Sequence, residues 1–354
     1  MTFYMTDTIK HQARPPGVSV VICTHNGASR IGPCLAALAA QRETHAIGWE
    51  ILIVDNRSSD NLAEVVQRFQ EASPGLQFRL VSEGTSGTAF ARQRGIAEAL
   101  YEFISFVDDD NDVEDLWVRK VYALMLAHPE IGACGGVNVP SYEMEPPYWC
   151  RSITGGLAIG PQSKSPGRMD SRCGTLWTSG MTLRWSAWRA VLARGFHPHV
   201  AGRIGGARGG SALMPGEDSE MSHALSMCGW TLWSDHDLKQ IHRIPAARLQ
   251  WDYFRRLYFG FGMSYVPLSP YRRLLKGQSP LKTDFWIMEI VRLTFALARR
   301  ENWYGWYCLL RSKEGSYSVL RVEKLLGMIS MLSRLRSGYG RICAQVRQFS
   351  LSTP

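Results

Sequence analysis

The chain has 354 residues, of which 45% are hydrophobic and 20% charged, a composition typical of a folded rather than a disordered protein. Its eight cysteines include no CxxC pair and no His/Cys cluster at zinc spacing, which argues against a disulfide framework and against a structural zinc site. The net charge of +9 lies in the tail, because residues 271–354 hold 15 Lys and Arg against 5 Asp and Glu (+10), whereas the rest hold 25 against 26 (−1).

The N-terminal segment does not resemble a cleaved secretory signal. Residues 1–16 contain Asp7, Lys10 and Arg14, and they include no continuous apolar block followed by small residues. A cleaved secretory signal requires such a block, so we expect a protein that stays in the cytoplasm.

Apolar β-branched runs alternate with segments of helical periodicity over the first 110 residues. The predicted strands are residues 18–24 (VSVVICT), 50–55 (EILIVD), 78–81 and 103–107, and the predicted helices are residues 29–41, 61–72 and 88–101. In the last of these helices we expect Phe90, Ile96 and Leu100 to face inward. The alternation indicates a mostly parallel, doubly wound α/β sheet, whose ligands bind at the carboxyl ends of the strands.

The second half of the chain is less regular. Residues 142–174 are rich in Pro, Gly, Ser and aromatic residues, and an ordered block follows from residue 176 to about residue 248. Helical periodicity dominates from residue 250 onward. Three prolines predict a break before the basic tail: Pro267, Pro270 and Pro280.

Three carboxylates directly follow the predicted strand at 103–107: Asp108, Asp109 and Asp110. Like charges within about 4–6 Å of one another disfavour ionisation unless a cation holds them together, and a hard divalent ion with oxygen ligands meets that need. Such an ion would also neutralise charge on a departing diphosphate. The alternative is the solvated N-terminus of a helix, whose dipole would favour the acids that follow: Asp112, Glu114 and Asp115.

A second polar motif, DNRSSD at residues 55–60, ends the predicted strand at 50–55. A carboxylate at such a strand end can accept hydrogen bonds from a base or a ribose, so Asp55 is a candidate nucleotide ligand. Ser59 and Asp60 have a simpler interpretation, because either side chain would cap the next helix.

A third polar motif, Glu217-Asp218, directly precedes a further predicted helix at residues 219–228. An acid at this place can cap the helix, or it can act as a general base that removes a proton from an attacking hydroxyl. The Gly-rich run before it, 202–216 (GRIGGARGGSALMPG), lacks the GK[ST] ending of a P-loop. It predicts either a lid that carries Arg203 and Arg208 to a diphosphate or a flexible surface loop.

Six short motifs follow one another between about residues 18 and 250. They are 18–26 (VSVVICTHN), 51–60 (ILIVDNRSSD), 87–96 (GTAFARQRGI), 104–111 (ISFVDDDN), 178–181 (TSGM) and 216–220 (GEDSE). In their order and spacing they resemble the inverting glycosyltransferases of family 2, which have the GT-A fold. The resemblance implies a GT-A sheet flanked by helices, and the periodicity of the tail adds a helical, basic C-terminal extension.

The resemblance implies roles for the polar residues at the strand ends. Thr24 and Asn26 would flank the nucleotide, Asp55 would face a uracil base, and Arg92 would lie beside the donor. Asn56 stands where the family usually has a second acid. Its amide can still hydrogen-bond a base, but the change leaves dTDP- and GDP-sugars open as donors.

The acid cluster matches the family's Asp-x-Asp motif. Asp108 would point towards the ribose or the sugar, Asp109 belongs to the same donor-binding cluster, and Asp110 would bind Mn²⁺ or Mg²⁺. His242 resembles a histidine that some relatives place near the metal or the diphosphate, and His236 is a weaker alternative. A lone histidine is, however, more often structural.

The resemblance implies metal-dependent, inverting transfer of a sugar from a UDP-linked donor to a hydroxyl acceptor, with Asp218 as the general base. The acceptor would be a glycan or a lipid-linked molecule in cell-surface polysaccharide or glycolipid biosynthesis. The expected segments are an N-terminal extension at 1–17, a GT-A domain at 18–250 (donor half about 18–115, acceptor half about 116–250) and a helical basic region at 251–354.

Three other functions are less consistent with the sequence. A dinucleotide-dependent oxidoreductase should show GxGxxG after its first strand, where this chain has THNGAS. A nucleic-acid-binding module would explain the basic charge, but that charge lies on an apolar-rich tail without a binding motif, so we expect no nucleic-acid partner. A non-catalytic relative that only binds nucleotide-sugar would not need the intact acid cluster and Asp218.

The basic tail contains a predicted amphipathic helix at residues 285–298 (FWIMEIVRLTFALA). Charged residues interrupt it, and about 18 or more apolar residues are needed to span a bilayer, so we do not expect it to cross one. One side would carry Glu289, Arg292 and Arg299, and the other Trp286, Ile290, Leu293 and Leu297. The tail either lies at the inner face of the cell membrane, with its basic residues on anionic lipid and Trp303 and Trp306 at headgroup level, or packs on the catalytic domain.

Overall fold

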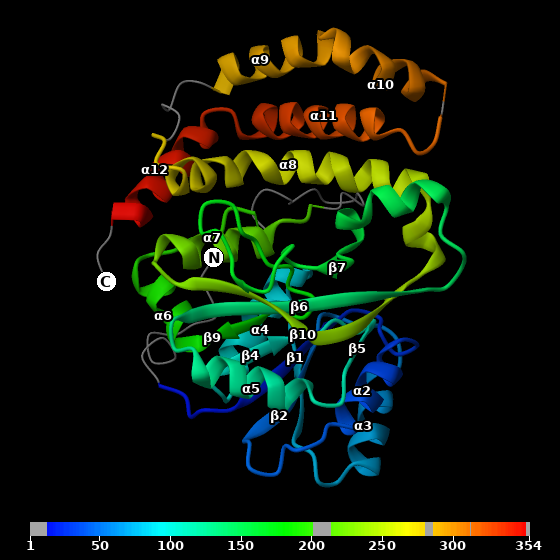
Figure 1. The fold of residues 1–354 in the computed structure, drawn as a ribbon, viewed down its shortest axis with the longest axis vertical. Helices are drawn as coiled ribbons and strands as arrows, with labels where there is room; N and C mark the ends of the chain where they lie inside the picture. Colours follow the sequence, from blue (N-terminus) through cyan, green and yellow to red (C-terminus); the bar gives the residue numbers. More distant parts are fainter. Residues whose placement is uncertain (1–12, 201–213, 280–285, 312, 352–354) are drawn as a thin grey trace.

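The computed structural model describes residues 13–200, 214–279, 286–311 and 313–351. One mixed sheet crosses the molecule (Figure 1), in the order β3-β2-β1-β4-β9-β6-β10-β5, with β7 paired to β6 and β8 to β10. The strands are β1 (Val18–Thr24), β2 (Trp49–Asp55), β3 (Phe78–Ser82), β4 (Phe103–Phe106), β5 (Asn111–Val113), β6 (Ile131–Tyr142), β7 (Gly160–Pro161), β8 (Gly167–Arg168), β9 (Thr182–Arg184) and β10 (Thr231–Ile244).

Parallel pairing dominates the sheet. β1 lies between β2 and β4, and β2 continues to β3, all in parallel. β9 then joins β4 to β6 by antiparallel pairing, β6 and β10 are parallel, and β5 pairs antiparallel with β10. The predicted mostly parallel, doubly wound α/β sheet is therefore confirmed, with an antiparallel strand between its two parallel parts. The carboxyl ends of β1, β2 and β4 meet at one edge.

Helices cover both faces of the sheet, because its central strands are apolar on both sides. The neighbouring residues Val20 and Val21 of β1 are both fully buried, in two different cores. One core contains residues of α4, α6 and α7, and the other residues of α2, α3 and α5. These helices are α2 (Ile31–Ala39), α3 (Leu62–Ala72), α4 (Thr88–Glu98), α5 (Trp117–Ala127), α6 (Trp185–Ala193) and α7 (Glu217–Met227), and the 3-10 turns are η1 (Tyr148–Ser152), η2 (Thr154–Leu157) and η3 (Ala246–Leu249).

The helix predicted over residues 88–101 ends earlier, at Glu98. The backbone N–H of Leu100 donates to Glu50 Oε1 at 2.8 Å and to Ser19 Oγ at 3.1 Å instead of to a helix carbonyl. The prediction that Leu100 faces inward is wrong, because its side chain is 41% exposed.

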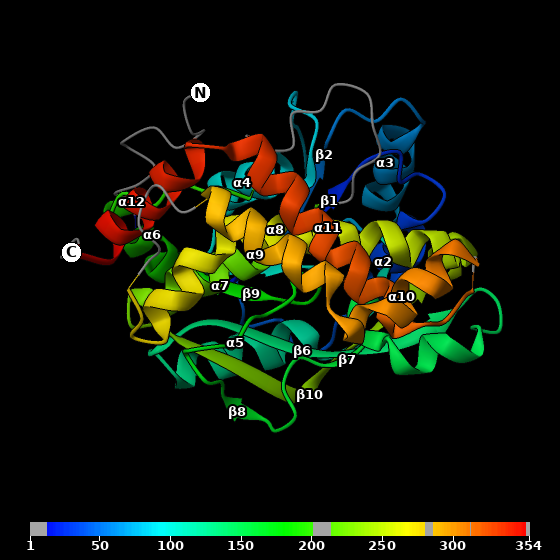
Figure 2. The same ribbon diagram turned by 90° about the horizontal axis from the view of Figure 1, so that it is seen from above.

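A stack of C-terminal helices lies over α7 and the sheet (Figure 1), and it confirms the predicted helical extension. They are α8 (Trp251–Leu275), α9 (Trp286–Ala298), α10 (Arg300–Leu310), α11 (Tyr317–Leu335) and α12 (Gly338–Leu351). Figure 2 shows α9 and α11 crossing above α8. A Cβ atom on Gly262 of α8 would lie 2.0 Å from the Lys324 carbonyl oxygen, and one on Gly327 would lie 2.0 Å from that of Phe259. Glycine at both positions therefore lets the α8 and α11 backbones touch.

α8 runs through Pro267 and Pro270, so the predicted break at these two prolines is wrong. A proline removes the hydrogen bond to the carbonyl four residues before it, which normally kinks or ends a helix. Here the Val266 carbonyl freed by Pro270 accepts from Ser269 Oγ at 2.9 Å, and both prolines are buried within the stack. Pro280 lies outside the described residues. None of the described helices is both long enough and apolar enough to cross a membrane.

Candidate functional site

The first group of site residues joins the ends of β1 and β4. Thr24 Oγ1 donates to Asp109 Oδ2, and the Arg30 guanidinium donates to Asp109 Oδ1 through Nε at 2.8 Å and lies 2.8 Å from Oδ2 through NH2. Asp109 is 7% exposed. Because both of its oxygens have partners within the protein, Asp109 holds the two strand ends together.

Asn26 joins the loops after β1 and β2. Its φ of 50° places it in the left-handed region, which asparagine tolerates better than most residues. Its backbone N–H donates to Ser58 Oγ at 2.9 Å, and its Oδ1 accepts from the Ser59 N–H at 2.8 Å. Asp55 Oδ1 accepts from the Ser58 N–H at 2.8 Å. The Asp55 hydrogen bonds in the described structure use Oδ1 alone, which leaves Oδ2 available to a ligand.

Two sequence interpretations at this loop change. Asp60 Oδ2 accepts from the Ala28 N–H at 2.9 Å, and α3 begins at Leu62 without a side-chain cap, so the prediction that Ser59 or Asp60 caps that helix is wrong. Asn56 is 6% exposed, and its amide donates to the carbonyls of Glu83 (3.3 Å) and Thr85 (2.6 Å) and accepts from the Gly87 N–H (2.8 Å). The Asn56 amide is therefore occupied by three loop contacts rather than free for a base.

Arg92 of α4 links the acid cluster to the N-terminus of α7. It forms an ion pair with Glu217 and lies 3.7 Å from Asp108 Oδ1. Asp108 has 34% of its side chain exposed, so it faces open space beside Arg92. Burial raises the pKa of Asp218, and the positive charge of Arg92 opposes that shift. Two signals far apart in the sequence, the acids after β4 and the acid pair before α7, thus meet around one guanidinium.

The acids after β4 do not form a helix N-terminus. They are followed by β5, and α5 begins only at Trp117 with no acid in its first turn. The antiparallel register of β5 and β10 places His242 opposite Asn111. That register brings His242 Nε2 within 3.9 Å of Asp110 Oδ1.

The Arg248 guanidinium of η3 lies between these two side chains. Its NH1 lies 3.1 Å from His242 Nε2, and its NH2 lies 3.1 Å from Asp110 Oδ2. Asp110 is 9% exposed, and burial followed by the charge of Asp108 raises its pKa to about 7. Burial and then Arg248 lower the pKa of His242, which favours the neutral imidazole that can accept a hydrogen bond or bind a metal.

This donor set fits a divalent ion that also has a diphosphate as ligand. Because burial and the charge of Asp108 disfavour ionisation of the Asp110 carboxyl, a nearby cation would stabilise its ionised form, and Mg²⁺ is usually held by one or two carboxylates plus substrate phosphates. Asp110 Oδ1 and His242 Nε2 lie 3.9 Å apart, close enough for both atoms to bind the same ion. Within the described part of the chain no group of three or more His, Cys, Asp or Glu side chains converges on one point, so the remaining ligands would come from the substrate and water.

The TSGM motif at residues 178–181 contacts the residues that follow β4. Ser179 Oγ is 2.5 Å from the Asn111 amide and accepts from Gln240 Nε2 at 3.1 Å. With the Asn111 amide oriented to satisfy both of its atoms, its nitrogen donates to Asp110 Oδ1 at 3.1 Å. Gly180 has a φ of 79°, and a Cβ atom there would lie 2.6 Å from Gln240 Nε2. The motif therefore orients Asp110 through a buried amide network.

Arg30 and Arg248 are site residues that the sequence patterns did not identify. Arg30 lies one residue before α2, and Arg248 lies in a short turn between β10 and α8. Neither is part of a recognisable motif. His236, by contrast, bonds the Ser163 carbonyl at 3.0 Å and does not join the acid cluster. Arg203 and Arg208, considered for a lid, lie outside the described residues.

Residues 19–189 of this chain match the family described as glycosyl transferase family 2. The matched region contains Thr24, Asp55, Arg92 and the acid cluster, whereas Asp218 and the residues after it lie beyond its end. Arg92 connects the matched region to the residues beyond it, because it lies near Asp108 and pairs with Glu217, the residue next to Asp218.

Curated proteins with sequence similarity are also glycosyltransferases. Glycosyltransferase AglE of Haloferax volcanii is 31% identical over 105 residues, which are 30% of this chain and 34% of that protein. The Escherichia coli protein UDP-Glc:alpha-D-GlcNAc-diphosphoundecaprenol beta-1,3-glucosyltransferase WfgD is 32% identical over 110 residues, 31% of this chain and 40% of that protein. The match thus spans well under half the length of either relative.

Solved structures with similarity include the mannosyltransferase PcManGT from Pyrobaculum calidifontis, in complex with GDP-Man and Mn²⁺. It has 18% sequence identity and a TM-score of 0.48, with 92% of this chain and 86% of that chain covered. A structure of S. aureus TarS with UDP has 15% identity and a TM-score of 0.45, with 91% and 92% covered.

Proposed function

We propose that this chain, whose residues 19–189 are a glycosyl transferase family 2 domain, transfers a sugar from a UDP-linked donor to a hydroxyl acceptor with inversion at the anomeric carbon. The observation that carries the proposal is the position of Arg92 between Asp108 and Glu217, the residue next to Asp218. It supports the proposal because a site for both the donor and the acceptor needs the acids after β4 close to the start of α7.

The donor half of the proposal rests on the strand-end residues. Asp55 Oδ2 would accept a hydrogen bond from an N–H of the base, and Thr24, Asn26 and Asp109 would hold the loops that shape the nucleotide pocket. Uracil is the preferred base because the name of the relative WfgD specifies a UDP-sugar. Thymine and guanine also present N–H donors, so dTDP- and GDP-sugars are the alternative donors.

Asp110 and His242 would hold Mn²⁺ or Mg²⁺, with Asp108 directed to the ribose or sugar. When bound, the ion would neutralise charge that develops on the departing diphosphate. Arg92, with 13% of its side chain exposed, is close enough to Asp108 to add a second positive charge near that diphosphate. Asp110 and His242 also fix the position of Arg248, which has to leave the space between them when the ion binds.

Asp218 would remove the proton from the acceptor hydroxyl as that hydroxyl attacks. Burial raises its pKa, which makes the carboxylate a stronger base than an exposed aspartate. The charge of Arg92 and the hydrogen bond from the Ser219 N–H oppose that shift, which favours the ionised carboxylate that a general base requires. The donor half at about 18–115 and the acceptor half at about 116–250 would then meet between Arg92 and α7.

A screen of nucleotide-sugars tests the function directly. The protein is incubated with UDP-, dTDP- and GDP-sugars with and without Mn²⁺, and released nucleoside diphosphate is measured. Metal-dependent release from one base class is the expected result. A protein that binds a nucleotide-sugar but releases no nucleotide from any of them, with glycan and lipid-linked acceptors supplied, would instead be a non-catalytic relative.

Arg248→Ala is expected to raise the affinity for Mn²⁺ in the absence of nucleotide by roughly tenfold. The guanidinium pairs with Asp110 at 3.1 Å, so an entering ion must displace it, and a hydrogen bond to a charged group is worth about 1.5–3 kcal/mol. Calorimetric Mn²⁺ titration measures the change. Arg243→Ala is the matched control. Arg243 lies on β10 directly after His242, but it pairs with Asp112 rather than with Asp110. Unchanged or weaker Mn²⁺ binding in Arg248→Ala would contradict the displacement.

The outer surface of the C-terminal stack suggests where the acceptor comes from. Leu293 and Leu297 of α9 are buried, as the amphipathic pattern predicts. The opposite side carries the exposed charge of Arg292, as the sequence indicated, but it also exposes apolar and aromatic residues: Ile287, Met288, Val291 and Phe295 on α9, and Trp303, Tyr304, Tyr307 and Leu310 on α10. Arg292 pairs with Glu289 beside it.

We propose that this outer surface rests on an anionic membrane and brings the site to a lipid-linked acceptor for cell-surface polysaccharide or glycolipid synthesis. Exposed aromatic side chains suit the headgroup region, and Arg311 and Lys313 lie over the Tyr307 ring at 5.9 and 5.1 Å. The exposed Arg299 and Arg300 at the start of α10 add positive charge. Such an acceptor agrees with the diphosphoundecaprenol named for the relative WfgD.

Flotation with anionic liposomes checks this surface. Phe295 and Trp303 are 70% and 61% exposed, and replacing both with Ser is expected to lower the membrane-bound fraction at least about tenfold, because each ring offers large apolar area. Tyr148→Ser is the control, since Tyr148 is 80% exposed but lies on η1 outside the outer surface. Wild-type protein that stays unbound at low and high salt would leave α9 and α10 as ordinary packing elements.

A further inference from the structure

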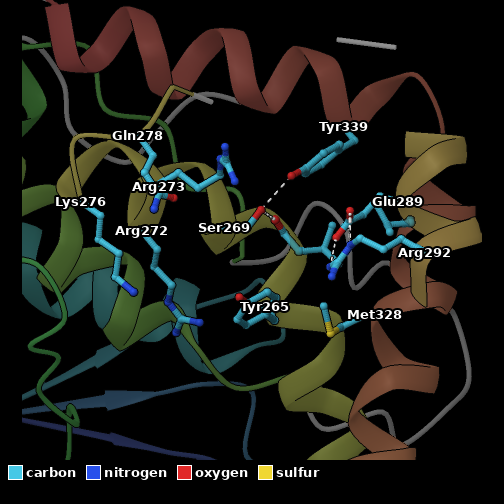
Figure 3. A pocket seen from close by; sticks show the side chains of 12 residues that line it. Tyr265, Ser269, Arg272, Arg273, Lys276, Gln278, Glu289, Arg292, Met328 and Tyr339 are labelled. Carbon is cyan, nitrogen blue, oxygen red and sulfur yellow. Dashed lines mark hydrogen bonds and ion pairs between the residues drawn. The ribbon is translucent and has the colours of Figure 1, made fainter. Parts of the chain in front are cut away.

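A second pocket, apart from the donor site, lies within the C-terminal stack. It has a volume of about 190 Å³, many times the roughly 10–15 Å³ that one water molecule requires. α8, α9, α11 and the start of α12 form its walls. Its lining residues are Tyr265, Val266, Ser269, Arg272, Arg273, Lys276, Gln278, Glu289, Arg292, Met328, Leu332 and Tyr339. Figure 3 shows the cations of α8 on one side and the Glu289–Arg292 pair on the other.

The pocket carries an excess of positive charge. Arg292 is neutralised by Glu289, with Nε donating to Oε2 at 2.8 Å. Among the residues that the structure describes, no carboxylate lies within ion-pair distance of the three remaining lining cations: Arg272, Arg273 and Lys276. The lining therefore has a net charge of about +3, with no internal anion to balance it.

Partial burial makes this imbalance costly. Desolvation lowers the pKa of Arg272, and desolvation followed by the charge of Arg272 lowers the pKa of Lys324 on the adjoining helix. Both cations lie against the ring of Tyr265, Arg272 at 5.0 Å and Lys324 at 5.4 Å from its centroid. A partly desolvated cation without a counter-charge is stabilised when an anion enters beside it.

Two guanidinium groups of the pocket keep unused N–H groups for such an anion. Arg272 donates through Nε to His223 Nε2 at 3.3 Å, and Arg273 donates through Nε to the Ser279 carbonyl at 2.9 Å. Within the described structure these Nε bonds are the hydrogen bonds of the two guanidiniums, and their terminal nitrogens make none. Two rigid guanidinium groups with free N–H pairs match the oxygens of a phosphate better than a single carboxylate, since phosphate accepts from several directions.

The floor of the pocket determines what can be attached to that anion. Val266, Met328 and Leu332 are apolar, and the hydroxyls of Ser269 and Tyr339 are bonded to each other at 2.7 Å. A phosphate ester would place its charged end among the α8 cations and its carbon-containing part against this floor. A free inorganic anion would use only the cationic end.

We propose that this pocket is a binding site for a phosphate group, carried by a membrane lipid headgroup or by a soluble phosphate. The site goes beyond the proposed transferase reaction, because it requires neither the donor nor a metal. Arg272 also contacts His223 of α7, the helix that begins with Glu217 and Asp218. An occupied pocket would therefore hold α8 and α7 together beside the acceptor half.

Calorimetric titration with inorganic phosphate tests the site, at constant ionic strength and with EDTA to remove metal from the donor site. The double variant Arg273→Gln/Lys276→Gln is expected to bind at least about tenfold more weakly than wild type, because each lost charge-assisted hydrogen bond typically costs that much. Both side chains are only partly buried or exposed, so the fold should be retained. Arg256→Gln is the matched control, an α8 cation that pairs with Asp252 outside the pocket.

Vesicles distinguish the two sources of phosphate. Phosphatidic acid vesicles are compared with phosphatidylcholine vesicles for proteins with and without the double variant, each also carrying Phe295→Ser and Trp303→Ser, so that the outer surface of α9 and α10 does not contribute to binding. Loss of vesicle binding together with phosphate binding in the double variant supports a lipid headgroup, and loss of phosphate binding alone supports a soluble phosphate. Equal affinities with and without the double variant for both probes, or an equal loss in Arg256→Gln, would overturn the proposal. No step uses a nucleotide-sugar, so failure of the transferase assay does not affect this result.

Discussion

Replacing Asp218 with Asn is expected to lower the rate of sugar transfer by about 10²–10⁴-fold, the usual contribution of a positioned general base. The amide keeps the size of the side chain but cannot take a proton from the acceptor hydroxyl. Asp218 makes no ion pair in the described structure, and Arg92 is held by Glu217 and Asp108 instead. The affinity for the donor should therefore change little.

Two measurements separate this loss from general damage. Calorimetry on Asp218→Asn should give the wild-type affinity for UDP, and NMR of the wild-type product should show inverted configuration, because a single displacement with a base on the acceptor side inverts the anomeric carbon. Unfolding temperature serves as the control for stability. Near-normal turnover in the variant, or retained configuration in the product, would refute the role of Asp218.

The edge of the sheet could be predicted from the sequence because each polar residue there follows its own apolar run. Asp55 ends β2, and the acids at 108–110 follow β4. In a parallel sheet such ends meet at one edge whatever the details of the loops. Local periodicity therefore specified both the fold and half of the candidate site.

The other half depends on contacts that local patterns do not encode. His242 lies beside Asp110 only because β10 pairs antiparallel with β5, in a register that no local motif announces. Arg248 then reaches the same space from a 3-10 turn six residues later. Arg30 likewise donates a hydrogen bond to Asp109, which lies 79 residues away in the sequence. Long-range pairing, rather than propensity, placed these three side chains.

The C-terminal stack shows the same limit for packing. Proline rules predicted a break within α8, but Ser269 satisfies the carbonyl that Pro270 frees and the surrounding helices bury the segment. In α9 the amphipathic pattern identified the buried side through Leu293 and Leu297. Glu289 and Arg292, three residues apart on the same helix, pair as helical spacing allows. The pattern did not reveal that this pair lines a pocket together with α8 and α11.

Replacing Asp110 with Ala is expected to remove the effect of metal on UDP binding. In wild type, Mn²⁺ should raise the affinity for UDP at least about tenfold, because a bound ion stabilises charge on the diphosphate by several kcal/mol. Without the Asp110 carboxylate, His242 alone remains of the two proposed metal ligands, and Arg248 loses its anionic partner. The variant should then bind UDP equally with and without Mn²⁺.

Asp115→Ala is the matched control for this experiment. Asp115 belongs to the same acidic stretch of sequence but is 47% exposed and pairs with Arg42 away from the strand ends. Its loss should leave the metal effect intact, because surface ion pairs contribute little and this one does not face the nucleotide. If wild-type protein binds UDP equally with and without Mn²⁺, the cation between Asp110 and His242 is Arg248 itself. The leaving diphosphate would then depend on Arg92 and Arg248 for its positive charge.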